Sequence, residues 1–113
     1  KKIKEILFEF VQKKGTIGLW GAGGFGLAAL NLYNIPKEHI NFIVDSDPQK
    51  WGLHYIDNSI TIISPEKAKS LDPDLLIITS MYSNSIMKNI IGIKFRASIL
   101  KIFPEVTYEE NHF

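Results

Sequence analysis

Apolar residues along the chain follow two spacings, and each spacing predicts a different element. Near the N-terminus they recur at every third or fourth position, which places them on one face of a helix. This stripe consists of Ile3, Ile6, Leu7, Phe10 and Val11. Elsewhere they form short runs, and continuous apolar runs are typical of parallel strands that are covered on both faces. The runs that predict strands span residues 16–20, 40–44, 60–63, 75–79 and 98–103.

Helix-forming segments separate these runs, and capping residues, glycine and proline mark their ends. Helices are expected at about residues 24–33, with Pro36 just beyond, at 65–71, with Ser64 as N-cap, and from about 85 to 96. Strands that alternate with helices predict an α/β fold with a parallel sheet. We therefore expect a three-layer Rossmann-like domain with a mainly parallel five-stranded sheet and an extra N-terminal helix.

The rest of the chain adds no further element to this prediction. The loop at residues 51–55 is expected to reach back toward the carboxyl end of the second strand or to cover the sheet edge. The tail at residues 104–113 has no regular period and is interpreted as an edge cover or a linker.

Length, charge and composition exclude several classes of protein. The 113 residues are the length of one domain, residues 1–113. The net charge of +1 argues against a nucleic-acid-binding protein, and the lack of cysteine excludes disulfides and zinc ribbons. Apolar runs fall well short of the roughly 20 residues that span a bilayer, so we expect no membrane span and a cytoplasmic location. Because the chain begins with Lys1, we expect a domain excised from a longer protein.

A glycine-rich turn follows the first predicted strand. It reads G-A-G-G-F-G, which has the G-x-G-x-x-G spacing of loops that hold a pyrophosphate against a helix N-terminus. In that motif the glycines permit a tight turn, close approach of the phosphates, and close packing of helix on strand. A nucleotide is the expected ligand, and a purely structural turn is the alternative. The candidate residues are Gly21, Ala22, Gly23, Gly24, Phe25 and Gly26.

Polar residues follow two further predicted strands. Asp45 comes directly after an apolar run, where a carboxylate accepts hydrogen bonds from ribose hydroxyls. Its competing role is to cap the turn that continues through Ser46, while Asp47 is predicted to be a cap itself. Ser80 and Tyr82 follow the strand at residues 75–79 and are expected to contact the ligand from its other side.

Catalytic and metal-binding motifs are missing from the sequence. His39, His54 and His112 have no Asp or Glu at ligand spacing, so we expect no metal site. The glycine turn lacks the Lys-Ser/Thr of a P-loop, which disfavours nucleoside triphosphate hydrolysis. Since the sequence offers no catalytic residue, a binding domain is favoured over a complete enzyme.

Four segments resemble small Rossmann-like domains of sugar-nucleotide enzymes over about residues 16–92. They read G-A-G-G-F-G, F-I-V-D-S-D-P-Q-K-W-G, I-T-I-I-S-P-E and D-P-D-L-L-I-I-T-S. The first resembles the glycine loop in the N-terminal domain of bacterial sugar O- and N-acyltransferases. The other three resemble the C-terminal domain of sugar C-methyltransferases, although the glycine loop of that family usually has a lysine where Phe25 stands.

These resemblances imply a nucleotide-sugar domain of a sugar-modifying transferase that acts in surface polysaccharide biosynthesis. The ligand, a UDP- or dTDP-sugar, would map onto residues 21–26 and 45–47, and the S-adenosylmethionine site of the methyltransferases lies in another domain. Two alternatives stay open. One is an NAD-binding domain of an oxidoreductase, because the carboxylate of Asp45 suits a free 2′-hydroxyl. The other is a module that binds no nucleotide and docks through its N-terminal helix onto a missing domain of the same parent chain.

Overall fold

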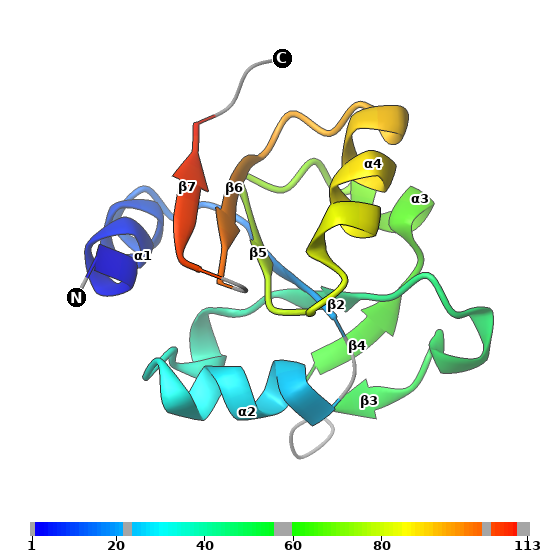
Figure 1. The fold of residues 1–113 in the computed structure, drawn as a ribbon, viewed down its shortest axis with the longest axis horizontal. Helices are drawn as coiled ribbons and strands as arrows, with labels where there is room; N and C mark the ends of the chain where they lie inside the picture. Colours follow the sequence, from blue (N-terminus) through cyan, green and yellow to red (C-terminus); the bar gives the residue numbers. More distant parts are fainter. Residues whose placement is uncertain (1, 22–23, 56–59, 103–104, 111–113) are drawn as a thin grey trace.

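The computed structural model describes residues 2–21, 24–55, 60–102 and 105–110, which form one α/β sheet structure (Figure 1). The strands are arranged in the order β3-β4-β2-β1-β5-β6-β7. The five central strands are parallel to one another: β4 (Ile60–Ile63), β2 (Phe42–Val44), β1 (Ile17–Trp20), β5 (Leu75–Ile78) and β6 (Ser98–Lys101). The predicted Rossmann-like α/β architecture is therefore confirmed.

The predicted count of five strands is wrong, because the sheet has seven. The two additional strands are β3 (His54–Tyr55) and β7 (Thr107–Glu109), which pair antiparallel with β4 and β6 at opposite edges. Of the two interpretations of the tail, an edge cover or a linker, the first holds for β7, which pairs with β6 at the edge of the sheet. Both strands are only two or three residues long and neither is a run of apolar residues, so periodicity gave no signal for them.

Helices cover both faces of the sheet (Figure 1). Helices α1 (Lys2–Gln12) and α2 (Gly24–Leu32) pack on one face, and α3 (Pro65–Ser70) and α4 (Ser83–Ile93) pack on the other. Short 3₁₀ turns at Lys37–His39 and Pro48–Lys50 flank β2. The apolar stripe of α1 lies against the sheet, since Ile3, Ile6 and Phe10 are all buried. The extra N-terminal helix is therefore part of the core.

Successive residues of each central strand enter opposite cores, as the pleat requires. Leu19, Ile43 and Ile77 belong to the core beneath α1 and α2. Trp20 belongs to the core beneath α3 and α4, where its ring meets that of Phe95 edge-on at 5.7 Å. This alternation fixes the direction of each side chain at the carboxyl ends of the strands.

Gly18, in the middle of β1, makes room for an aromatic ring from the neighbouring strand. It pairs with Phe42 on one side and Leu76 on the other. A Cβ atom at this position would lie 2.7 Å from Cζ of Phe42, closer still to Cε1 of the same ring, and 3.1 Å from Cδ2 of Leu76. The glycine is therefore required by packing.

Helix termini follow the predicted signals with one exception. The Oγ of Ser64 accepts a hydrogen bond from the backbone N–H of Lys67 at 3.1 Å, which confirms Ser64 as the N-cap of α3. Helix α4 begins two residues earlier than predicted, and its N-cap, Tyr82, makes no side-chain capping bond. Each of the four helices is followed by a non-glycine residue with positive φ: Lys14 (57°), Asn34 (55°), Asp72 (50°) and Lys94 (67°). Among the described residues, no helix is long and apolar enough to cross a membrane.

Candidate functional site

The loops after β1, β2 and β5 meet at the carboxyl edge of the sheet. The chain leaves β1 toward β2 and β4, and later returns to β5 on the other side of β1. Open α/β sheets bind ligands at such a reversal of strand order, in the crevice outside the carboxyl ends. The topology therefore places the predicted glycine turn at the position where a nucleotide site is expected.

Gly21 begins this turn and has two physical reasons to be glycine. Its φ of +130° lies in a region that side chains rarely adopt. A Cβ atom would also lie 3.1 Å from Oγ1 of Thr79 and 3.3 Å from the backbone nitrogen of Ser80. The loops after β1 and β5 are thus in close contact.

The remaining residues of the glycine motif are described only in part. Ala22 and Gly23 lie outside the described residues. Gly24, Phe25 and Gly26 form the first turn of α2, so the helix begins where the motif predicts. An anion held by this turn would face the N-terminus of a nine-residue helix.

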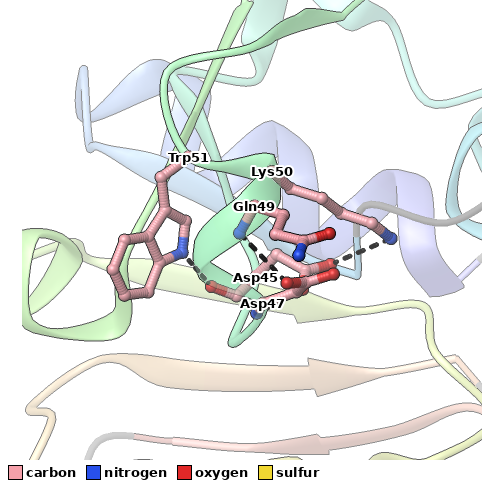
Figure 2. A network of polar contacts seen from close by, with 5 residues as sticks. All are labelled: Asp45, Asp47, Gln49, Lys50 and Trp51. Carbon is pink, nitrogen blue, oxygen red and sulfur yellow. Dashed lines mark hydrogen bonds and ion pairs between the residues drawn. The ribbon is translucent and has the colours of Figure 1, made fainter.

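Asp45 follows β2 and is held in a network of polar contacts (Figure 2). Its Oδ1 accepts a hydrogen bond from the backbone N–H of Asp47 at 2.9 Å, and its Oδ2 lies 3.8 Å from Nζ of Lys50. The backbone carbonyl of Asp45 accepts a hydrogen bond from Nε1 of Trp51 at 2.7 Å. The turn-capping role is therefore present, and ribose binding by the same carboxylate stays a prediction.

The two residues after Asp45 have different surroundings. Oδ1 of Asp47 accepts a hydrogen bond from the backbone N–H of Gln49 at 3.0 Å, which confirms the prediction that Asp47 is a cap (Figure 2). Ser46 is exposed and faces the crevice. The bond from Trp51 shows that the loop after Asp47 folds back to the end of β2, one of its two predicted positions.

A hollow of about 230 Å³ lies at this edge, between the strand ends and α4. It is lined by Trp20, Gly21, Asp45, Ser46, Ser80, Tyr82, Ser85, Ile86 and Asn89. Five of the predicted site residues are thus brought together, whereas Asp47 is not among the lining residues. The Oγ of Ser80 accepts a hydrogen bond from the backbone N–H of Tyr82 at 3.0 Å, and the ring of Tyr82 is 71% exposed.

Sequence reasoning missed Ser85 and Asn89, which line the hollow from α4. They stand four residues apart and therefore share one face of the helix. Polar residues at such a spacing are ordinarily interpreted as a solvated helix face. The signal that could have found them is their place in the first two turns of the helix after the switch-point strand.

The lining suits binding better than catalysis. Asp45 and Tyr82 are the ionisable residues in the lining, and the remaining polar groups are hydroxyls and an amide. Within the described parts of the chain, no three His, Asp or Glu side chains gather as a metal site would require. Hydroxyls, an amide and one carboxylate offer hydrogen bonds to a polar ligand, and the exposed ring of Tyr82 offers a surface on which a ring can stack.

Residues 1–98 match the protein family described as C-methyltransferase C-terminal domain. This is one of the two families that the sequence resembles. No curated protein matches the chain.

Solved structures share the fold at low identity. UDP-D-quinovosamine 4-dehydrogenase from Vibrio fischeri is 22% identical with a TM-score of 0.60, over 80% of this chain and 79% of that one. RSP, a Rex-family repressor, is 19% identical with a TM-score of 0.58, over 91% of this chain and 53% of that one. RSP in complex with beta-NADH gives a TM-score of 0.57 at the same identity and coverage. The chain therefore spans about half the length of RSP, and these similarities show the fold alone. Because the family match includes residues 1–98 of 113, the chain belongs to the family of C-methyltransferase C-terminal domains.

Proposed function

We propose that this domain binds a nucleotide-sugar, a UDP- or dTDP-sugar, at the carboxyl edge of its sheet, as part of a sugar-modifying transferase of surface polysaccharide biosynthesis. The observation that carries the proposal is Gly21. Its positive φ and its contact with the β5 loop both demand glycine, and it begins a G-x-G-x-x-G turn that leads into α2. The methyl-transfer chemistry would belong to another part of the parent protein.

Asp45 supports a nucleotide in particular. Trp20 pairs with Val44, so the residues that follow them, Gly21 and Asp45, are neighbours on adjacent strands. Neighbouring strands lie about 4.8 Å apart, so a ribose at Asp45 would lie beside a pyrophosphate on the glycine turn. The Asp45 side chain is 17% exposed, and its carboxylate is a hydrogen-bond acceptor of the kind that ribose hydroxyls require.

The comparisons support a ligand of this class. The name of the dehydrogenase from Vibrio fischeri identifies a UDP-sugar as its substrate. The matching family belongs to C-methyltransferases, and the resemblance to sugar C-methyltransferases implies a sugar acceptor. The dehydrogenase shares the fold of this chain, and a nucleotide-sugar would occupy the crevice at the carboxyl edge of the sheet.

A dinucleotide is the second candidate, and one observation favours it. RSP, which shares the fold, is seen in complex with beta-NADH. A carboxylate at the end of the second parallel strand also suits the free 2′-hydroxyl of NAD over the phosphate of NADP. In this case the domain would serve an oxidoreductase.

Thermal unfolding in the presence of ligands separates these candidates. A panel of UDP-glucose, dTDP-glucose, NAD⁺, NADH, NADP⁺, coenzyme A and S-adenosylmethionine covers them. A ligand at 100 times its Kd adds about 2.7 kcal/mol to the free energy of unfolding. The unfolding entropy of about 2.1 cal/mol/K per residue gives roughly 0.24 kcal/mol/K for this chain, so Tm should rise by about 11 °C. We expect this shift with a UDP- or dTDP-sugar.

Two variants test where the ligand binds. Asp45→Asn keeps the acceptor oxygen for Asp47 and removes the charge, so the shift should shrink. Asp72→Asn is the matched control, because Asp72 is exposed and lies before β5, at the opposite edge of the sheet. A shift that both variants retain would contradict the proposed site. Unchanged Tm with every ligand of the panel would contradict the proposed function itself.

A further inference from the structure

Thr79, the residue after β5, has a buried hydroxyl without a hydrogen-bond partner. Its side chain is fully buried, and within the described parts of the chain its Oγ1 contacts neither a donor nor an acceptor. More than nine in ten buried polar groups in folded proteins have a partner, so an exception calls for a physical reason. The hydroxyl lies beside Gly21, at the point where strand order reverses.

Thr79 lies in one row with two residues of the proposed nucleotide site. The ladder continues one residue beyond the strands, since Gly21 N–H donates to the Val44 carbonyl at 3.1 Å and Thr79 N–H donates to the Trp20 carbonyl at 3.3 Å. Asp45, Gly21 and Thr79 are therefore neighbours across β2, β1 and β5.

The alternation of side chains along the strands gives the direction of the Thr79 side chain. Two residues earlier in each strand stand Ile43, Leu19 and Ile77, which lie in the core beneath α1 and α2. Because side chains alternate along a strand, Thr79 continues the row of Ile77 and points to the face on which α2 begins. It lies beside Gly21, which has no side chain, and its Oγ1 is 3.1 Å from the position of the missing Cβ.

Among the described residues the hydroxyl of Thr79 makes no hydrogen bond that stabilises the fold. Valine has the same shape as threonine, and replacing an unbonded buried hydroxyl with a methyl group removes a desolvation cost. If this position served packing alone, valine would therefore be the more stable choice. A ligand held at the glycine turn would supply the partner that the described residues do not.

We propose that Thr79 binds the ligand at the glycine turn, where its O–H donates, directly or through one water, to an oxygen of the group beyond the second phosphate. The inference rests on the proposed nucleotide site. Strands about 4.8 Å apart separate Asp45 from Thr79 by roughly 10 Å, with the pyrophosphate between them on Gly21. A nucleoside monophosphate that begins at Asp45 ends near Gly21. A ligand that reaches Thr79 is a nucleoside diphosphate carrying a second group, as in a nucleotide-sugar.

The test compares two ligands with Thr79→Val and Thr79→Ser. UDP-glucose carries a group beyond the second phosphate, and UMP does not. Thr79→Val should weaken UDP-glucose binding by about tenfold, the equivalent of one lost hydrogen bond, and leave UMP binding unchanged. Thr79→Ser keeps the hydroxyl and should bind both ligands like the native protein. Thr61→Val, on β4, which lies beyond β2 from β1, controls for the loss of a threonine hydroxyl elsewhere.

Stability gives an independent readout. Without ligand, Thr79→Val should unfold at a higher temperature than the native chain, because it removes the unbonded hydroxyl. A lower Tm would show that the hydroxyl already has a structural partner and would overturn the inference. The inference would also be wrong if Thr79→Val bound UDP-glucose as tightly as the native protein does, or if it lost as much affinity for UMP as for UDP-glucose. The proposed function would stand in both cases. If the native protein bound none of UDP-glucose, dTDP-glucose and NAD⁺, both the proposed function and this inference would be wrong.

Discussion

Replacing Gly18 with alanine would drive a methyl group into a closed part of the core. The new Cβ would lie 2.7 Å from Cζ of Phe42 and 3.1 Å from Cδ2 of Leu76. Real Cβ contacts below 3.0 Å are essentially absent from proteins, so the ring or the strand has to move. Phe42 is only 4% exposed and Leu76 is fully buried, so neither can swing into solvent. The strain must be taken up by the sheet.

The cost follows from two opposing effects. Overpacking a core costs about 1–3 kcal/mol. Alanine recovers about 0.5–1 kcal/mol of the backbone entropy that glycine loses in a strand. The midpoints of the two ranges give a net destabilisation of about 1.2 kcal/mol, which an unfolding entropy of roughly 0.24 kcal/mol/K converts to a Tm lower by about 5 °C.

Circular dichroism melts of Gly18→Ala measure this directly. Phe42→Leu provides the control, since the smaller side chain vacates the space that the new methyl group needs. If the clash causes the loss, the double variant Gly18→Ala/Phe42→Leu should be more stable than the sum of the two single effects predicts. An unchanged or higher Tm for Gly18→Ala, or strictly additive effects, would refute the packing argument.

Two further substitutions test the helix termini. Ser64→Ala removes the acceptor for the backbone N–H of Lys67 and should cost about 1 kcal/mol, or roughly 4 °C in Tm; an equal Tm would contradict its role as N-cap. Lys94→Gly relieves a φ of 67° and keeps the backbone carbonyl that accepts from Nζ of Lys69, so urea unfolding should show a gain of about 0.5–1 kcal/mol; a loss would mean that the lysine side chain contributes more than its backbone strain costs.

The parallel core of the fold could be predicted because each strand is a distinct apolar run with turn or capping residues beside it. The runs that gave β1, β2, β4, β5 and β6 stand between glycine, proline and capping residues, and the ends of α2 and α3 followed from the same signals. Strands β3 and β7 could not be found this way. Each is held by hydrogen bonds to the strand next to it in the chain, and its own residues do not form an apolar run.

Residues of the candidate site could be predicted where their position in the backbone, at the end of a strand, determines their place in the fold. Gly21 and Asp45 follow strands and are positioned by the ladder, so sequence order alone placed them. Ser85 and Asn89 face the hollow only because α4 packs with one particular rotation, which the sequence does not reveal. Thr79 was predicted as the end of a strand, and its missing hydrogen-bond partner is visible only in the structure.

The edge strand β7 has a consequence for solubility and for where the domain can be cut. It shields β6, which in turn shields β5, and β5 reads Leu-Leu-Ile-Ile with all four side chains buried. A chain shortened to the 98 residues that the family match covers would lose most of β6 and all of β7. It would leave β5 as an open apolar edge, the kind of surface that recruits further strands and aggregates. The unremarkable tail therefore protects the most aggregation-prone segment of the sheet.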